Sequence, residues 1–526
     1  MKTSSPSRRD FLKVAGVGAV ASAATSVRAA APDATPLAVN PTPRYELSPY
    51  LYMQFMEPLG TTDGSVSAAW DYDHDCWRED VVEVTASLAP PMVRWGGVLA
   101  AYYRWREAVG PRDQRVPMRN LVWGGVEPNQ VGTHEFIDFC RQVKADPLIC
   151  VNFESDGRKR WAKTPKGEVR FGDAKEAADW VRYCNDPDSA ERRGHGVADP
   201  YDVKFWQLGN ETSYEKDAFH VDVAAEKSIE FAKAMRAVDP DIKLIGWGDV
   251  GWPENNHSGT CWAPRMLEIA GEHLDYIAFH HMFNHDHGLE DSPLSDTAYR
   301  DDPAWTWERL MQAPAAHESR INWIRDNTKD YDTPLAMTEC HFAFPGRDRC
   351  EVLSTWAAGV AYARLVNLHE RHGDRLKIAT LADFCGTRWQ VNAVMIPVPW
   401  GRSFLMPTAL IMRLYRHHSG ERALDVTRTP SDLDVTASRT GDRVFLHVAN
   451  TNRKLPVRVS FDVEGLNVRG GRVFELAQDP EFEVTAMSQH LLQPVEKKLH
   501  DDGTWLFPAA SVSAVELVVT EDEVNA

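Results

Sequence analysis

The sequence predicts an α/β protein, a (β/α)8 TIM barrel followed by a C-terminal antiparallel β-sandwich. From about residue 49 to residue 418, eight short apolar runs typical of buried strands alternate with longer segments that are apolar at helical spacing. After about residue 420 only runs with period-two alternation follow, separated by Gly, Asp, Asn and Pro. A doubly wound open sheet is the competing arrangement, but no glycine-rich phosphate motif follows the first strand.

The first 31 residues predict an export signal. The stretch "SRRDFLK" precedes a short run rich in Ala, Gly and Val, and alanine-rich cleavage candidates lie near residues 29–31. The apolar run is too short for a membrane-spanning helix. Because the pattern S-R-R-x-F-L-K resembles a twin-arginine signal, we expect export through that pathway to the periplasm or the medium.

Residues 32–48 are expected to be extended and available to pair with the sandwich, which we place at residues 419–526. The barrel spans residues 49–418, and its strand candidates are, in order, "PYLYMQF", "MVRWGG", "PLICVNF", "VKFWQLG", "KLIGWGD", "YIAFHHMF", "LAMTECHF" and "ATLADFCG". Amphipathic segments such as "THEFIDFCRQVKA" and "VDVAAEKSIEFAKAMRAVD" separate them. Strands that alternate with helices are joined by crossovers, so we expect them to be parallel.

Composition excludes several functional classes. The formal net charge of -18 and the lack of a Lys/Arg-rich run argue against a nucleic-acid partner. The eight cysteines are spread singly without a C-x-x-C pair, which argues against a zinc ribbon or a redox motif. Buried thiols are expected, and the sequence leaves disulfide pairing open.

Two carboxylates follow predicted strands. Glu211 comes directly after the fourth strand, and Glu339 lies at the end of the seventh. Active sites of such barrels lie at the C-terminal ends of the strands. A pair of carboxylates at that position is typical of enzymes that hydrolyse glycosidic bonds. Each could instead be a loop carboxylate, and the sequence gives no distance to separate a retaining from an inverting pair.

Several blocks resemble a known enzyme family over most of the chain from about residue 36. They are "PYLYMQFMEPLG", "REDVVEVTASLAPPMVRWGG", "VEPNQVGTHEFIDFCRQVKADPLICVNF", "WVRYCN" and "VKFWQLGNE". Their order and approximate spacing are similar to those of the family 51 α-L-arabinofuranosidases, which are retaining glycosidases of clan A. The resemblance implies the same barrel and sandwich and requires no cofactor and no metal; it leaves a homo-oligomer open.

The resemblance also implies roles for individual residues. Glu211 matches the general acid/base, and Glu339 matches the nucleophile. Asn210 matches the residue that contacts the sugar 2-hydroxyl. Glu57 matches a carboxylate that binds sugar hydroxyls, with a surface loop residue as the alternative. We expect burial and the negative charge of Glu339 to raise the pKa of Glu211, so that it can donate a proton.

The turn after the second strand matches a substrate-contacting turn of the family. It carries Arg94 and Trp95, and Arg94 is equally well explained as a structural ion-pair partner. The family pattern R-Y-P-G-G-N has become R-W-G-G-V here, so that Val98 stands where an amide is usual.

Further departures affect the sugar-binding residues. The pattern H-x-Y-Y has become "HHMF", and E-W-N has become "ECH". We expect His280, His281 and His341 to supply replacement polar contacts. Trp389 and Gln390, in "WQVN", resemble the family's Q-L-V-N with the Gln displaced by one position. Because lost hydroxyl contacts change specificity strongly, the reaction type is better predicted than the sugar.

The segment "HHMFNHDHG" raises a metal hypothesis for His281, His285, Asp286 and His287. Solvated or substrate-contacting histidines are the preferred interpretation, because no step of the expected reaction needs an ion.

The sequence therefore predicts an exported retaining glycoside hydrolase that removes terminal furanosyl residues from polysaccharide or oligosaccharide, without membrane insertion. The alternatives are a clan A glycosidase of other specificity (xylosidase, glucuronidase, galactofuranosidase or endo-glucanase) and a catalytically inactive carbohydrate-binding barrel.

Overall fold

The computed structural model describes residues 34–57, 65–214, 218–251, 260–282, 294, 297–342, 349–398 and 400–521, all within one compact unit. The predicted export signal and the residues His285, Asp286 and His287 lie outside these ranges. None of the helices within them is both long and apolar enough to pass through a bilayer.

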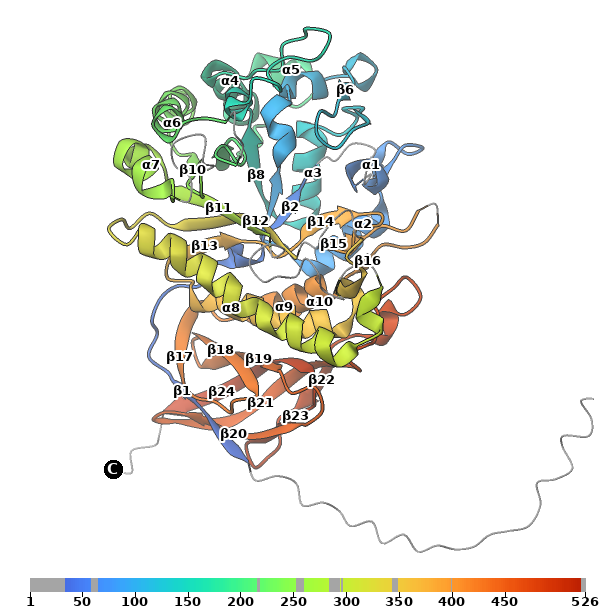
Figure 1. The fold of residues 1–526 in the computed structure, drawn as a ribbon, viewed down its shortest axis with the longest axis vertical. Helices are drawn as coiled ribbons and strands as arrows, with labels where there is room; N and C mark the ends of the chain where they lie inside the picture. The colour runs from blue at the N-terminus through green and yellow to red at the C-terminus, as the bar shows by residue number, and fades with distance from the viewer. Residues whose placement is uncertain are drawn as a thin grey trace, which may run out of the picture. The chain divides into compact units, whose positions relative to one another are not determined.

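The first part of the unit is an α/β barrel (Figure 1). Its strands pair in parallel in chain order, as expected for strands joined by crossovers. They are β2 (Gln54–Met56), β5 (Met92–Trp95), β8 (Asp146–Val151), β9 (Phe205–Leu208), β10 (Lys243–Trp247), β11 (Tyr276–Met282) and β12 (Leu335–His341). Their residues are almost all buried, since parallel strands have both faces covered.

The eighth strand position is interrupted. β13 (Leu376–Ala379) pairs with β12, whereas β14 (Asp383–Gly386) pairs with β2. Between them the Thr380 hydroxyl donates a hydrogen bond to the Ala382 carbonyl (3.1 Å), which favours a local turn over a continuous strand. β14 continues the sheet to β15 (Asn392–Met395) and β16 (Phe404–Leu405). The α/β barrel is thus confirmed, but a regular eightfold repeat is not.

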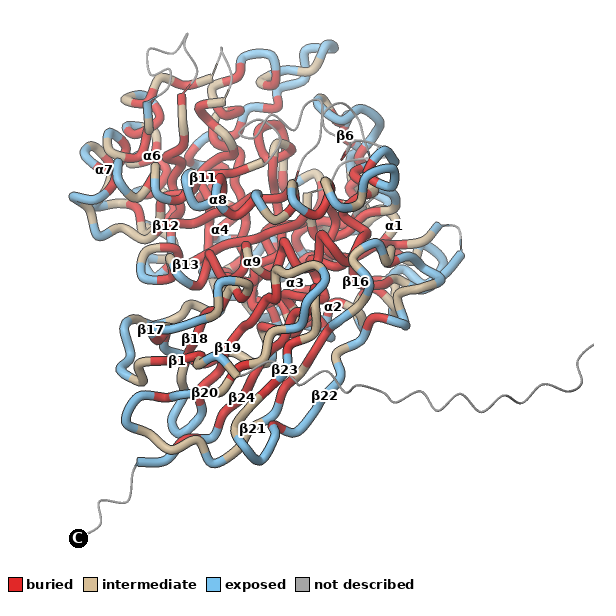
Figure 2. Tube along the Cα trace, turned by 60° about the horizontal axis from the view of Figure 1, so that its bottom comes forward, coloured by how far each residue is buried: buried red, intermediate tan, exposed pale blue. Residues whose placement is uncertain are grey.

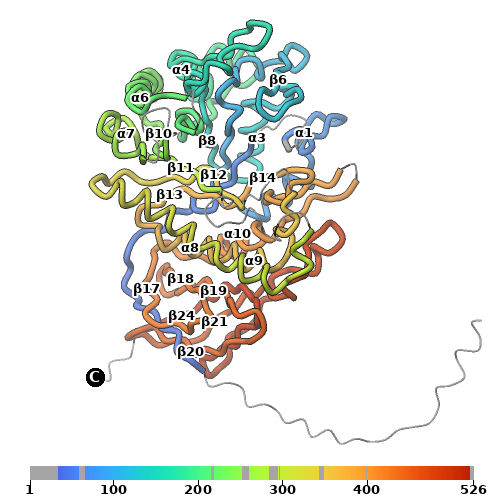
Figure 3. The backbone as a smooth tube through the Cα atoms, viewed as in Figure 1, coloured from blue at the N-terminus to red at the C-terminus, as the bar shows by residue number. Residues whose placement is uncertain are grey.

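Helices cover the outside of this sheet (Figures 1 and 3). The longer ones are α2 (Glu79–Leu88), α3 (Thr133–Val143), α4 (Ala174–Asn185), α6 (Val221–Arg236), α7 (Ala263–Ala270), α8 (Pro303–Asn327), α9 (Trp356–Arg371) and α10 (Pro407–His417). Local signals set their ends: Asp173 caps α4 by accepting from the Glu176 amide (2.8 Å).

The C-terminal part is a sheet domain that includes the N-terminal strand β1 (Thr35–Asn40). Its other strands are β17 (Arg422–Arg428), β18 (Leu433–Thr440), β19 (Arg443–Asn450), β20 (Val457–Val463), β21 (Leu466–Ala477), β22 (Val495–Lys498), β23 (Thr504–Phe507) and β24 (Ser511–Glu521). β1 belongs to the segment 32–48 and pairs with both β17 and β20.

This domain differs from the predicted antiparallel sandwich. The order β20-β1-β17-β18-β19-β24-β21 closes on itself through the Val463–Leu466 pair, which makes a seven-stranded barrel. The pairing of β1 with β20 is parallel. A sandwich and a closed sheet both bury one face of each strand, so period-two alternation does not distinguish them.

The helix α9 lies between the two parts and is buried along almost its whole length (Figure 2). It contacts β18, β19 and β24. Its buried Glu370 carboxylate accepts hydrogen bonds from the Tyr52 and Thr436 hydroxyls (2.5 Å each) and contacts His447 Nδ1 (2.9 Å). This network joins the barrel to the sheet domain.

Candidate active site

Three polar side chains meet at the C-terminal ends of β9, β11 and β12. His280 Nδ1 lies 2.9 Å from Glu211 Oε1 and 3.7 Å from Glu339 Oε2. One donor atom from each of the three residues lies within 4.8 Å of the others. The structure therefore brings together the two carboxylates that the sequence singled out.

A β-bulge aims the residues of β11 and β12 at each other. His280 pairs with Glu339, whereas Phe279 pairs with Met337, so the register shifts at this point. The extra residue, Thr338, places its hydroxyl 2.9 Å from His280 Nε2. Bulges often re-aim side chains near active sites, and here both nitrogens of one imidazole have partners.

The backbone at Glu211 is strained. Its φ of 52° lies in the left-handed region, which costs a non-glycine residue about 1–2 kcal/mol. Arg158, which is buried, donates to the carbonyls of Glu211 (2.7 Å) and Asn210 (3.4 Å). Asp156 accepts from the Asn210 amide (3.2 Å), and a Cβ on Gly209 would lie 2.4 Å from the same carboxylate oxygen. These contacts hold the turn that presents Glu211.

Arg94 is fully buried and connects three residues of the site. It donates to Glu339 Oε1 (2.9 Å), Asn210 Oδ1 (2.7 Å) and Gln207 Oε1 (2.9 Å). Of the two interpretations of Arg94, the structure favours the ion-pair partner.

Burial raises the pKa of Glu211 to about 7, with Arg158 and Arg94 opposing the rise. Among the largest contributions, the carboxylate that adds to the rise is Asp249, which follows β10. Asp249 is buried and accepts hydrogen bonds from the His280 amide (3.0 Å), the Tyr214 hydroxyl and Arg320.

His280 is neutral at neutral pH, because burial lowers its pKa to about 4. A neutral imidazole has one donor and one acceptor nitrogen. With its hydrogen on Nδ1, the imidazole can donate to Oε1 of Glu211 in either protonation state of that carboxyl, while Nε2 accepts from the Thr338 hydroxyl.

Glu57 and Asn210 provide further polar groups. Burial, reinforced by the charges of Glu339 and Asp383, raises the pKa of Glu57. Its carboxyl lies against the turn after β5, where the Leu99 amide donates to it (3.4 Å) and a Cβ on Gly97 would lie 2.5 Å from its Cδ. Asn210 Nδ2 is buried and has no hydrogen-bond partner within the described ranges.

His341, Trp389 and Gln390 were also predicted to bind substrate, and the structure places them as follows. His341 Nδ1 donates to the Phe342 carbonyl (2.6 Å), and its Nε2 lies 3.6 Å from Asp383, beside the site. Trp389 and Gln390 lie on the loop between β14 and β15. The Trp389 ring packs edge-on against Trp123, with 6.3 Å between ring centroids.

Two further residues that were predicted to bind substrate are not brought to the carboxylates. The Trp95 ring packs in the core against Phe136 of α3, with centroids 5.2 Å apart. His281 faces away from His280 because successive strand residues alternate, and its Nδ1 lies 2.9 Å from His317 of α8.

Sequence reasoning missed Asp249, Asp383 and Arg158. Asp249 ends the run "KLIGWGD", so the strand-end rule that selected Glu211 would have found it. Asp383 and Arg158 carry no local signal, since their roles depend on residues distant in the chain. For a metal, the group in the described ranges with suitable spacing is Glu211, His280 and Glu339 itself, where Arg94 already pairs with Glu339.

Comparisons with known proteins agree with this geometry. The family model of the α-L-arabinofuranosidase 1 domain matches residues 84–300, and that of the α-L-arabinofuranosidase C-terminal domain matches residues 337–511. The chain is 30% identical over 362 residues to the intracellular exo-α-(1→5)-L-arabinofuranosidase of Acetivibrio thermocellus, covering 64% of this chain and 67% of that protein.

A second relative is the probable α-L-arabinofuranosidase C of Aspergillus terreus, 34% identical over 230 residues, which are 42% of each chain. Among solved structures, a family 51 α-L-arabinofuranosidase from Bifidobacterium longum superimposes with a TM-score of 0.75 at 21% identity. It covers 93% of this chain and 100% of that one, which shows that the two share a fold.

Proposed function

Because the chain belongs to the α-L-arabinofuranosidases of glycoside hydrolase family 51, we propose that it removes terminal α-L-arabinofuranosyl residues from oligosaccharides or polysaccharides with retention of configuration. The chain is a glycoside hydrolase, and its substrates are carbohydrates. What we propose is the identity of the sugar, the exo action and the retention of configuration.

The short distance between the two carboxylates is the observation that supports retention of configuration. Retaining glycosidases have carboxyl groups about 5–5.5 Å apart, whereas inverting enzymes need about 6.5–9.5 Å to admit a water. The nearest oxygens of Glu211 and Glu339 are within 4.8 Å. This separation supports direct attack by one carboxylate on the sugar.

In the first step, Glu339 attacks the anomeric carbon while Glu211 donates its proton to the departing oxygen. The C–O bond to the leaving group breaks as the bond to Glu339 forms. Arg94 donates a hydrogen bond to Glu339, and burial keeps Glu211 protonated up to about pH 7.

In the second step, Glu211 is ionised and accepts a proton from water, whose oxygen attacks the anomeric carbon and releases Glu339. In both steps Nδ1–H of His280 can donate to Oε1 of Glu211 while Nε2 accepts from the Thr338 hydroxyl, so that the proton of Glu211 is carried on its other oxygen. His280 thereby stabilises each form of Glu211 with a hydrogen bond.

The sugar would be held by buried polar groups of the site. Asn210 Nδ2 is a buried donor suited to a hydroxyl beside the anomeric carbon. Glu57, whose pKa is raised by burial, is the second group, because the family resemblance assigns it to the sugar hydroxyls.

Turnover of a panel of aryl glycosides tests the proposal. The wild-type protein should cleave the α-L-arabinofuranoside in preference to xyloside, glucuronide and galactofuranoside analogues, and the first sugar released should be the α-anomer by NMR. Glu339→Gln should reduce kcat by several orders of magnitude while the protein stays folded. Initial release of the β-anomer, or an unimpaired Glu339→Gln variant, would refute the mechanism.

We also propose that residues 1–31 direct export through the twin-arginine pathway, on the basis of the "SRRDFLK" pattern. Cell fractionation should place the wild-type protein outside the cytoplasm, and Arg8→Lys together with Arg9→Lys should retain it inside. Equal distribution of the two proteins would contradict this assignment.

A further inference from the structure

An ion pair connects the helix α8 to the active site. Asp249, which follows β10, is fully buried, and its Oδ1 accepts a hydrogen bond from the Arg320 guanidinium of α8. Burying a carboxylate is costly unless a cation and hydrogen bonds compensate its charge. Neither side chain takes part in the two chemical steps, so the ion pair needs a different explanation.

The other oxygen of Asp249 joins the turn after β9 to the strand β11. Oδ2 accepts hydrogen bonds from the His280 amide (3.0 Å) and from the Tyr214 hydroxyl. Tyr214 lies three residues after Glu211, and its amide donates to the Glu211 carbonyl (3.0 Å). One carboxylate therefore holds both of the elements between which Glu211 and His280 make their 2.9 Å contact.

Aromatic contacts orient the two side chains that donate to Asp249. The Tyr214 ring packs edge-on against Trp247 of β10, with ring centroids 5.2 Å apart. The Arg320 guanidinium lies 4.5 Å from the ring centroid of Trp323, about one turn further along α8. Because a stacked guanidinium has little freedom left to lose, it forms its ion pair at a low entropic cost.

The ion pair also places two opposite charges near the proton donor. The charge of Asp249 raises the pKa of Glu211. At the Tyr214 hydroxyl, the charge of Asp249 raises the pKa and that of Arg320 lowers it, so the two charges oppose each other at this position. Removal of Asp249 and removal of Arg320 should therefore change the pKa of Glu211 in opposite directions.

Glu211 also faces titratable or charged side chains on the other elements packed around it. They are Glu57 after β2, Arg94 of β5, Asp156 and Arg158 after β8, Tyr214 of its own turn, His280 of β11, and Glu339 and His341 of β12. All of these remain in the variants described below, so a change between variants reports the ion pair alone.

We infer that Arg320 is a positioning residue, which acts through Asp249 to hold Glu211 and His280 in their mutual geometry and to balance the charge beside the proton donor. This inference rests on the proposed function, in which Glu211 donates the proton. A residue of the outer helix layer thereby acts on the reaction without touching the substrate. If the ion pair served only to hold α8 on the barrel, its loss would lower Tm and leave the pH profile unchanged.

The test is the pH profile of kcat/KM for an aryl α-L-arabinofuranoside. Asp249→Asn removes the negative charge and Arg320→Met removes the positive charge, whereas Arg320→Lys keeps it. The double variant Asp249→Asn/Arg320→Met buries no unpaired charge. Its comparison with Asp249→Asn isolates the effect of Arg320 even if Arg320→Met alone does not fold.

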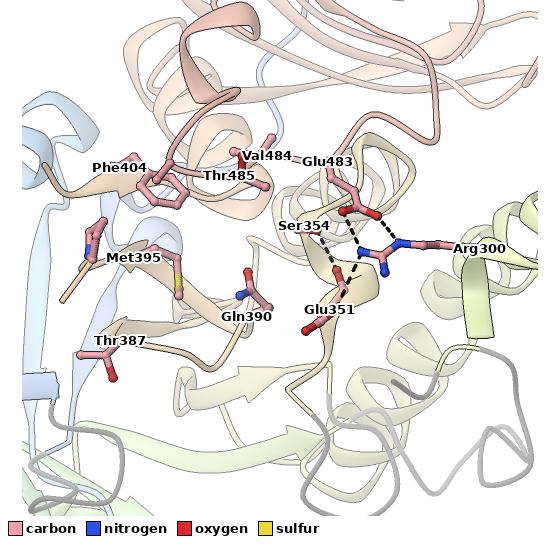
Figure 4. Close-up of a pocket in the computed structure, with 12 residues that line it drawn as sticks. Arg300, Glu351, Ser354, Thr387, Gln390, Met395, Phe404, Glu483, Val484 and Thr485 are labelled. Atoms are coloured by element: carbon pink, nitrogen blue, oxygen red, sulfur yellow. Dashed lines mark hydrogen bonds and ion pairs between the residues drawn. The ribbon is translucent and has the colours of Figure 1, made fainter. Parts of the chain in front are cut away.

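A matched control is an ion pair at a pocket of about 330 Å³ where the barrel meets the sheet domain (Figure 4). Three barrel loops line this pocket through Arg300, Glu351 and Thr387, and a segment of the sheet domain lines it through Glu483. The Arg300 guanidinium donates to Glu483 (2.7 and 2.9 Å). Because Asp249 is not among the lining residues, Arg300→Met loses a guanidinium and an ion pair at a different place.

Asp249→Asn should move the alkaline limb to lower pH by about one unit, so that kcat/KM at pH 8 falls by about tenfold relative to its plateau. Arg320→Met should move the limb to higher pH. Arg320→Lys should lie closer to the wild type, the double variant should lie above Asp249→Asn, and Arg300→Met should keep the wild-type limb.

Two results would overturn the inference, whatever the change in Tm. One is a limb that stays in place, or shifts in the same direction, when Asp249 and Arg320 are replaced singly. The other is a double variant whose limb coincides with that of Asp249→Asn. Failure of the wild type to cleave the aryl glycoside would instead refute the proposed function.

Discussion

The protonation of Glu211 should set the alkaline limit of activity. With its pKa raised to about 7 by burial, about half of the Glu211 side chains are protonated at pH 7. At the ordinary value of 4.5 only roughly 0.3% would be protonated at that pH. Burial therefore increases the population of the competent acid by more than about a hundredfold at neutral pH.

The assay is the pH profile of kcat/KM, which reports the pKa of the free enzyme. For an aryl arabinofuranoside with a poor leaving group, kcat/KM should fall by about tenfold per pH unit well above pH 7. Glu211→Gln should remove this limb and lower the rate by about 10²–10⁴. With a strongly acidic phenol as leaving group the variant should lose much less, because little proton donation is needed.

Two results would refute this reasoning. One is a limb centred near pH 4.5, which would mean that burial does not raise the pKa of Glu211. The other is an unchanged limb in Glu211→Gln, which would mean that a different group titrates. Matched far-ultraviolet circular dichroism of the two proteins provides the control for folding.

Three further predictions concern charge and stability. Arg94→Lys should lower kcat by at least about a hundredfold with little change in fold, because Lys cannot donate to Glu339, Asn210 and Gln207 together. Steady-state kinetics measures the loss of kcat, and a thermal melt checks that the variant is folded. A near-normal kcat would contradict the prediction. Burial raises the pKa of Glu127 from 4.5 to about 7. The folded protein therefore favours the protonated carboxyl, and this stabilisation is fully present below pH 4.5. The free energy of unfolding falls by up to about 3 kcal/mol as the pH rises through 7. Glu127→Gln should thus raise Tm at pH 9 and not at pH 4, and equal shifts at both pH values would count against this. Dialysis against EDTA should leave kcat/KM unchanged, and a stoichiometric ion found by elemental analysis, with activity lost on its removal, would overturn the expectation of a metal-free site.

The sequence predicted that Glu211 and Glu339 lie together, because that prediction depends on strand order alone. Glu211 and Glu339 each follow an apolar run, and strand ends of a barrel converge whatever the side-chain details are. The places of Trp95 and His281 depend instead on which face of a strand each residue occupies, and the structure turns both side chains away from the two carboxylates.

The alternation of strand and helix, the order of the parallel strands and the positions of Glu211 and Glu339 were determined by the sequence itself, because local periodicity records which residues are buried. The tertiary structure decided what depends on contacts between distant residues. These are the pairing of Arg94 with Glu339, the influence of Asp249 on Glu211, the closure of the C-terminal sheet, and the pocket built from three barrel loops and a segment of the sheet domain. Such contacts follow from register, bulges and domain packing, which no local pattern records.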